Sequence, residues 1–128
     1  DTCVLNLATG HWRMVEVSAE ARYGHVGVLI GSTLMVHGGL SAARRSPVAL
    51  LSNAVALNLE APSAGWVPAS GEDEDAAGIG RAFAVSAAVD STGYVFGGYT
   101  ARDVLSAETL SVRLPPPPLG HAEERLRG

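Results

Sequence analysis

The side chains that could carry out chemistry in this sequence are four histidines, one cysteine and one acidic run. The histidines are His11, His25, His37 and His121. No two of them have the spacing of a zinc site, and no Cys-x-x-Cys pair is present. The acidic run Glu72–Asp75 lacks the alternating ligands and internal glycine of a calcium loop, which predicts a solvated loop. Cys3 lies in an alternating strand pattern and is predicted to be a small buried core residue.

Composition removes several further classes of function. The nine basic residues are all arginine, which excludes a Schiff-base lysine and a phosphate-loop lysine. No Gly-x-Ser-x-Gly motif is present. The net charge of −4 on 128 residues does not fit a nucleic-acid surface. No apolar stretch is long enough to span a membrane and no signal peptide is visible, so an intracellular location is favoured. We therefore expect a protein that is not an enzyme, with no cofactor and no bound metal.

The strongest pattern in the sequence is an internal repeat. The segment Arg22–Gly39 aligns without a gap to the segment Arg81–Gly98, which begins 59 residues later. Both segments begin with arginine, continue through small and apolar residues, and end in a glycine pair. These pairs are Gly38-Gly39 and Gly97-Gly98. A fixed period of this length predicts stacked supersecondary units rather than a compact sandwich.

A second similarity flanks the first. Leu5-Asn6-Leu7 is followed by Trp12, and Leu57-Asn58-Leu59 is followed by Trp66. The same apolar alternation appears a third time in Leu110–Leu114. The two tryptophans therefore fall in register, and we expect them to pack between neighbouring units.

Apolar runs between turn residues predict the strands that position these residues. A buried strand is expected over Gly24–Ile30, and a second over Thr33–His37, with a tight Gly31-Ser32 turn between them. The third strand is expected over Asn53–Leu59, and a short fourth strand begins at Trp66-Val67. Four antiparallel strands in this order form one sheet of a repeating array.

Together, the Arg-x-x-His start, the strand ending in Gly-Gly, the Asn-Leu strand and the following tryptophan resemble the kelch repeat. The resemblance implies an all-β fold, an incomplete β-propeller of antiparallel four-stranded blades. It makes Arg22, Arg81 and the glycine pairs structural repeat residues. We expect the arginines to tie blades together by hydrogen bonds to backbone or carboxylates, and the glycines to allow close backbone approach. Ala84 replaces the histidine in the second unit, and no tryptophan follows Leu114.

The phase of the repeat divides the chain into five parts. Residues 1–20 form the second half of a first blade, 21–70 a complete blade, 71–80 an acidic inter-blade loop, 81–114 most of a further blade, and 115–128 a proline-rich tail. About two blades are present, whereas a closed propeller needs about four to eight. We therefore expect part of a longer protein, or a chain that another chain completes, and not an independently folded monomer.

The resemblance implies a protein-interaction or scaffolding module within a larger propeller or a multi-subunit assembly. The loops Leu40–Ser52 and Tyr99–Ala107 both join second to third strands, so we expect them on one face. The candidate partner-binding residues on these loops are Arg44, Arg45, Tyr99 and Arg102. The alternative is a fragment of a kelch-type enzyme, such as a copper oxidase or a sugar isomerase. The expected partner is a protein, possibly the chain that completes the ring.

Overall fold

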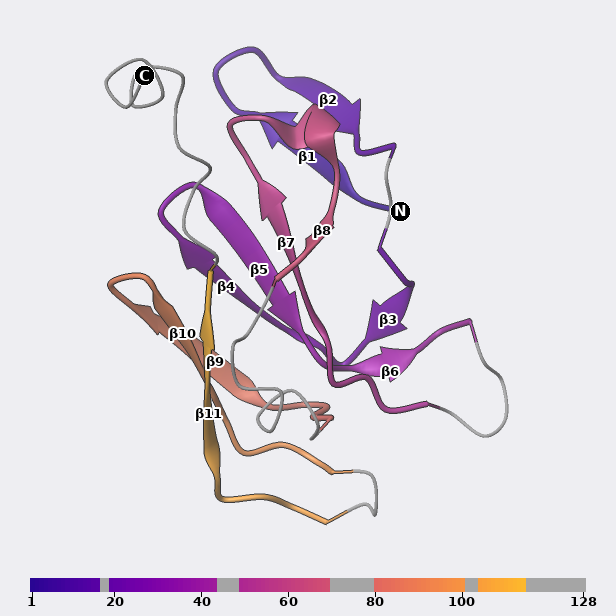
Figure 1. The fold of residues 1–128 in the computed structure, drawn as a ribbon. Helices are drawn as coiled ribbons and strands as arrows, with labels where there is room; N and C mark the ends of the chain where they lie inside the picture. Colours follow the sequence, from indigo (N-terminus) through magenta and orange to yellow (C-terminus); the bar gives the residue numbers. More distant parts are fainter. Residues whose placement is uncertain (17–18, 44–48, 70–79, 101–103, 115–128) are drawn as a thin grey trace, which may run out of the picture.

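The computed structural model of the protein describes residues 1–16, 19–43, 49–69, 80–100 and 104–114 (Figure 1). Its architecture is all-β, with antiparallel sheets and one short 3-10 helix, η1 (Pro62–Ala64). Among these residues, none belongs to a helix that is long and apolar enough to cross a membrane. The sheets follow one another along the chain as an N-terminal hairpin, a first sheet and a second sheet.

The N-terminal hairpin pairs β1 (Cys3–Asn6) with β2 (His11–Met14). Its turn is held by the Asn6 side chain, whose Oδ1 accepts hydrogen bonds from the amides of Ala8 and Thr9. Asn and Gly are typical of such turns because a short amide side chain can bond the local backbone. The hairpin lies beside the end of the first sheet (Figure 1), where Trp66 Nε1 donates to Thr2 Oγ1 at 3.0 Å.

The first sheet has the four antiparallel strands that the sequence predicts. Their bounds are β4 (Val26–Ile30), β5 (Thr33–His37), β7 (Ala54–Asn58) and β8 (Val67–Pro68), in the spatial order β4-β5-β7-β8. The predicted strand Thr33–His37 is confirmed at both ends. The predicted Gly31-Ser32 turn is also confirmed, since Ile30 pairs with Thr33 across it.

The strand expected over Gly24–Ile30 is shorter than predicted, because the extended backbone conformation is interrupted at Gly24 and β4 begins only at Val26. The preceding β3 (Arg22–Tyr23) leaves the sheet and pairs instead with β6 (Leu40–Ser41). Gly24 has a φ of +64°, a left-handed conformation that cannot continue a strand. The ring of Phe83 lies directly over Gly24, so a side chain there would collide with it.

The second sheet repeats the first with three strands. These are β9 (Val85–Val89), β10 (Thr92–Phe96) and β11 (Thr109–Arg113), in the order β11-β10-β9. Asp90 occupies the turn position of Gly31 in the first sheet and has the same left-handed backbone, with a φ of 52°. Aspartate tolerates this conformation better than most residues, so the hairpin survives the change.

The core lies between the two sheets, which stack face to face. Val28, Met35 and their neighbours in the first sheet pack against Val112, while Val26 packs against Val95 and Leu110 of the second sheet. A Cβ added at Gly93 would come within 2.6 Å of Met35 Cε, so the absence of a side chain there allows the two sheets to meet. Ser86 Oγ also donates to the Gly27 carbonyl at 2.9 Å, which ties neighbouring strands of the two sheets together.

The prediction that Cys3 is a buried core residue was wrong, because Cys3 is exposed. Trp12 is also 69% exposed and does not pack between two sheets. Cys3 pairs with Met14 and Leu5 pairs with Trp12, so these four side chains share one side of the hairpin, and Met14 is also exposed. An alternating pattern indicates which side chains share a face, but it does not indicate what covers the face.

Candidate functional site

The two repeat-phased arginines make the same contact in their two units. Arg22 Nη1 donates to the Gly38 carbonyl at 3.0 Å, and Arg81 Nη1 donates to the Gly97 carbonyl at 3.2 Å. Each arginine therefore holds the end of its own second strand at the glycine pair. The contacts repeat at the same separation of 16 residues in both units.

The charge around the two arginines differs between the units. Arg81 Nη2 forms an ion pair with Glu108 Oε2 at 2.8 Å. Asn53 stands in the corresponding place of the first unit, since the amides of Gly38 and Gly97 bond to the carbonyls of Asn53 and Glu108 respectively. Arg22 has no carboxylate there: its Nη1 lies 3.4 Å from the Asn53 carbonyl in addition to its bond to Gly38, and its Nη2 is buried without a hydrogen-bond partner.

A buried histidine lies in the field of both arginines. His37 ends β5, is 3% exposed, and its Nδ1 has no hydrogen-bond partner. Burial lowers the pKa of His37 below its ordinary value, and the charges of Arg22 and Arg81 lower it further, whereas a backbone hydrogen bond involving Ser52 opposes them. Burial likewise lowers the pKa of Arg22, against the opposing effect of Glu20. We call Arg22, His37 and Arg81 the Arg–His cluster.

The glycine pair of the first unit brings the second unit close to this cluster. Gly38 and Gly39 both have left-handed backbones, with φ of +68° and +92°. The amide of Gly39 donates to the Arg81 carbonyl at 2.7 Å, and a Cβ on Gly38 would collide with that same oxygen. The Arg–His cluster is therefore a junction between units, and its chemistry is structural.

The predicted partner-binding residues are only partly visible. Arg44, Arg45 and Arg102 lie outside the described residues, as do the acidic run Glu72–Asp75 and the tail 115–128. Tyr99 is exposed, and its backbone exchanges two hydrogen bonds with Ala82, at 2.8 and 3.1 Å. The two loops join β5 to β7 and β10 to β11, and their described parts extend toward the same side of the molecule (Figure 1).

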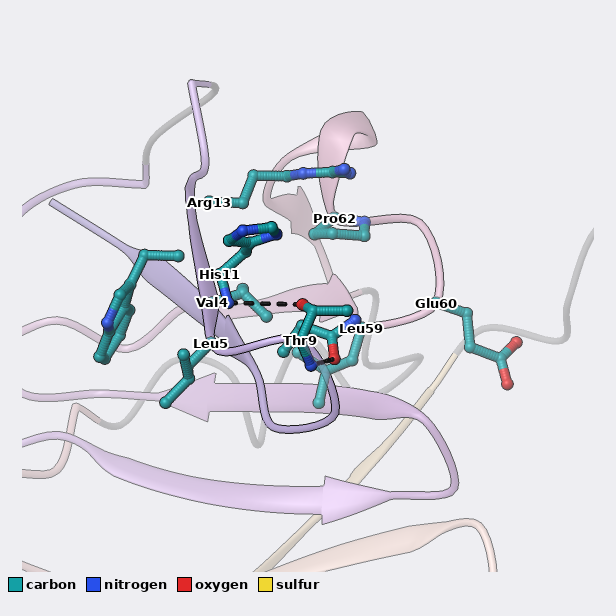
Figure 2. Close-up of a pocket in the computed structure, with 10 residues that line it drawn as sticks. Val4, Leu5, Thr9, His11, Arg13, Leu59, Glu60 and Pro62 are labelled. Carbon is teal, nitrogen blue, oxygen red and sulfur yellow. Dashed lines mark hydrogen bonds between the residues drawn. The ribbon is translucent and has the colours of Figure 1, made fainter.

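A groove that the sequence did not predict lies between the hairpin and the turn after β7. Its volume is about 720 Å³. Figure 2 shows His11 and Arg13 directed toward Pro62, whereas the carboxylate of Glu60 points away from them. The groove is lined by Val4, Leu5, Asn6, Thr9, His11, Trp12, Arg13, Leu59, Glu60 and Pro62. One wall is the hairpin, and the other is Leu59 with the turn residues Glu60 and Pro62; nothing in the spacing of the sequence shows that these two segments face one another.

One face of the second sheet is not covered by any described residue; it is apolar on β9 and β10 and polar on β11, where Thr109, Ser111 and Arg113 lie on the same side. It carries Val85, Ala87, Val89, Tyr94 and Phe96, which share one side of β9 and β10. We call these five residues the open face. The corresponding positions of the first sheet are buried, with Val26 at 8% and Ile30 at 7% exposure, because the second sheet covers them. Val85 is 65% exposed and Val89 is 58% exposed.

The described ranges contain no group of three or more histidine, cysteine, aspartate or glutamate side chains placed to hold a metal ion. The contacts of the site are therefore those of a repeat junction, a groove and an open face. Comparison with protein-family models and with curated proteins finds no match to this chain.

Proposed function

We propose that this chain is part of a kelch-type β-propeller that serves as a non-catalytic protein-interaction or scaffolding module. The observation that carries the proposal is the repetition of one contact set in two units. Arg22 and Arg81 each bond the carbonyl of the first glycine of a pair. The carbonyl of the second glycine of each pair also accepts a hydrogen bond: Gly39 from the amide of Leu51, and Gly98 from the amide of Ser106.

The packing of the sheets supports the same proposal. Each sheet is antiparallel, and the second sheet lies face to face on the first through β4 and β9. Propeller blades stack in this way, so that each sheet has one neighbour on each face. The open face then occupies the place where a further blade would stack, and its apolar character agrees with that role.

The loops that follow the glycine pairs are the proposed partner-binding segments. They share one end of the two sheets, and such connections commonly carry binding residues because rigid strands hold them in place. Tyr99 offers an exposed aromatic ring on a backbone that Ala82 fixes. Arg44, Arg45 and Arg102 would add donors for carboxylates or backbone carbonyls of the partner.

Site-specific photo-crosslinking in cells of the source organism tests this proposal. A benzophenone amino acid at position 99 reports on the loop end, and one at position 91 reports on the opposite end of the second sheet. We expect a discrete cross-linked protein from Tyr99 and none from Ser91, because only the loop end contacts the partner. The triple change of Arg44, Arg45 and Arg102 to alanine should reduce the yield at Tyr99.

Two outcomes would count against the proposal. Equal cross-linking from Ser91 would show that the loop end is not the binding surface. Metal analysis of the purified protein provides the second check, since copper at one equivalent per chain would indicate a kelch-type oxidase rather than a scaffold.

A further inference from the structure

The groove beside the N-terminal hairpin has one wall that is rich in hydrogen-bond donors. Val4 pairs with Arg13, and Asn6 pairs with His11, so these four side chains share one side of β1 and β2. All four line the groove, and the turn after β7 forms the wall opposite them. The groove therefore lies between two described parts of the chain.

The polar groups of the hairpin wall are available to a ligand. Among the described residues the only ion pair lies in the second unit, so Arg13 has no carboxylate partner there. Asn6 uses its Oδ1 to accept two amides of its own turn, which leaves its amide nitrogen to donate. Figure 2 shows Arg13 and His11 one above the other, both extending toward Pro62. The wall thus offers a guanidinium, an imidazole and an amide to an acceptor.

The opposite wall is mainly apolar. Leu59 is 37% exposed, and Pro62 is half-buried. Glu60 also lines this wall, but its carboxylate points away from Arg13 and His11 (Figure 2). A ligand that matches both walls carries an anionic acceptor beside an aliphatic group.

Charge and exposure narrow the class of ligand. The carboxylate of Glu60 repels a doubly charged phosphate more strongly than a singly charged carboxylate, and a guanidinium pairs with a carboxylate through two parallel hydrogen bonds. Small-molecule sites cover most of their ligand, whereas none of the residues that line this groove is buried. An extended peptide fits an open groove with two walls, because its successive side chains point in opposite directions.

We propose that this groove binds an extended segment of a partner protein in which an aspartate or glutamate is adjacent to an aliphatic residue. The acidic side chain pairs with Arg13 and accepts a hydrogen bond from His11. The aliphatic side chain packs against Leu59 and Pro62 on the other wall.

This site is separate from the partner-binding loops of the proposed function. The groove lies where β7 ends at Asn58, which pairs with Thr33 at the start of β5, whereas the first loop begins after the end of β5. The second sheet, which carries Ser91, packs on β4, and β4 and β8 are the two outer strands of the first sheet. Cross-linking from positions 99 and 91 therefore does not report on the groove.

A peptide array tests the proposed ligand class. Two adjacent positions in a Gly-Ser frame carry every pair of natural amino acids and phosphoserine, and the purified protein is the probe. We expect it to select pairs of an acidic and an aliphatic residue. Fluorescence anisotropy then compares the selected peptide with its amide counterpart, asparagine for aspartate or glutamine for glutamate. Arg13→Gln should weaken binding of the acidic peptide about tenfold, because it removes a charge-assisted hydrogen bond.

Two further variants separate the groove from general effects of charge and folding. Glu60→Gln should tighten binding about twofold, because it removes a negative charge beside the ligand. A disturbed fold would not produce that gain. Arg113→Gln, at the exposed end of β11, changes the net charge by the same amount as Arg13→Gln and should leave binding unchanged.

Three results would overturn the inference. The first is an array without preference for acidic residues, or with a stronger response to phosphoserine. The second is equal binding of the acidic peptide and its amide counterpart. The third is binding that Arg13→Gln leaves unchanged, since the peptide would then lie elsewhere on the molecule. Cross-linking at Tyr99 tests the proposed function separately, and its failure would not alter these titrations.

Discussion

At the scale of single residues, the two units differ most in how they neutralise the repeat-phased arginine, which is half-buried as Arg22 and buried as Arg81. Arg81 has the carboxylate of Glu108 at 2.8 Å, whereas Arg22 has only carbonyl oxygens within hydrogen-bond distance. A buried donor without a partner costs stability, because it loses its bonds to water on folding. The first unit therefore has an electrostatic deficit: it lacks a carboxylate that pairs with its arginine, whereas the second unit has Glu108.

Asn53→Glu should correct this deficit, since it places a carboxylate where the second unit has Glu108. We expect the free energy of unfolding to rise by about 0.5–1 kcal/mol, because the site is partly exposed and solvent screens the pair. Urea denaturation at low salt measures the change. Asn53→Gln is the matched control and should give no gain, and an equal gain from glutamine would show that the charge is not responsible.

The buried His37 predicts a pH dependence of stability. Because its pKa is lowered from 6.5, the folded protein binds fewer protons at this site than the unfolded chain. Its contribution to stability is therefore complete above pH 6.5 and is lost as the pH falls through the lowered folded pKa. His37→Phe, which copies Phe96 of the second unit, should flatten the unfolding free energy across this range. His25→Ala, which copies Ala84, should leave the wild-type slope.

The sequence predicted residue contacts better than residue burial. The expected hydrogen bonds from Arg22 and Arg81 to backbone and carboxylate are present, but each side chain bonds within its own unit, so the prediction that the side chains tie two units together was wrong. The burial of Cys3 could not be predicted correctly, because burial depends on a neighbouring sheet and not on the strand itself. The orphaned Nη2 of Arg22 depends on Asn53, which lies 31 residues away in the sequence.

At the scale of elements, the glycine pairs decide how closely the units approach. Gly38→Ala should lower the free energy of unfolding by about 2–4 kcal/mol, because its Cβ collides with the Arg81 carbonyl oxygen. Gly10→Ala is the matched control, since Gly10 has a similar φ of +72° with no atom near its missing Cβ. The control should cost about 1 kcal/mol. Equal losses in thermal or urea unfolding would show that φ alone matters.

Strand positions were largely predictable, and the exceptions have local causes. Alternating apolar residues and a Gly-X turn located β4, β5 and their hairpin, because both signals are contained in a short window. The break at Gly24 was missed, because it depends on Phe83 of the next unit. The groove beside His11 was missed for the same reason, since its two walls are far apart in the sequence.

At the scale of the whole molecule, no described residue covers the side of the second sheet that carries Val85, Val89 and Phe96. A further blade that covers this side should stabilise the folded state by removing apolar surface from water. We therefore expect residues 1–128 on their own to melt less cooperatively in differential scanning calorimetry than the same residues with this side covered. A sharp melt of a monomer would contradict both this expectation and the prediction that the chain does not fold alone.

The hydrogen bond from Gly39 to the Arg81 carbonyl also provides a built-in reporter. It is 2.7 Å long and joins the end of β5 to the start of the second unit. The Gly39 amide therefore loses its partner whenever the second unit separates, even while the first sheet stays intact. Its deuterium uptake should follow the separation of the units, whereas the Met35 amide inside β5 should follow unfolding of the first sheet. The ratio of these two uptake rates gives the cooperativity between neighbouring units directly.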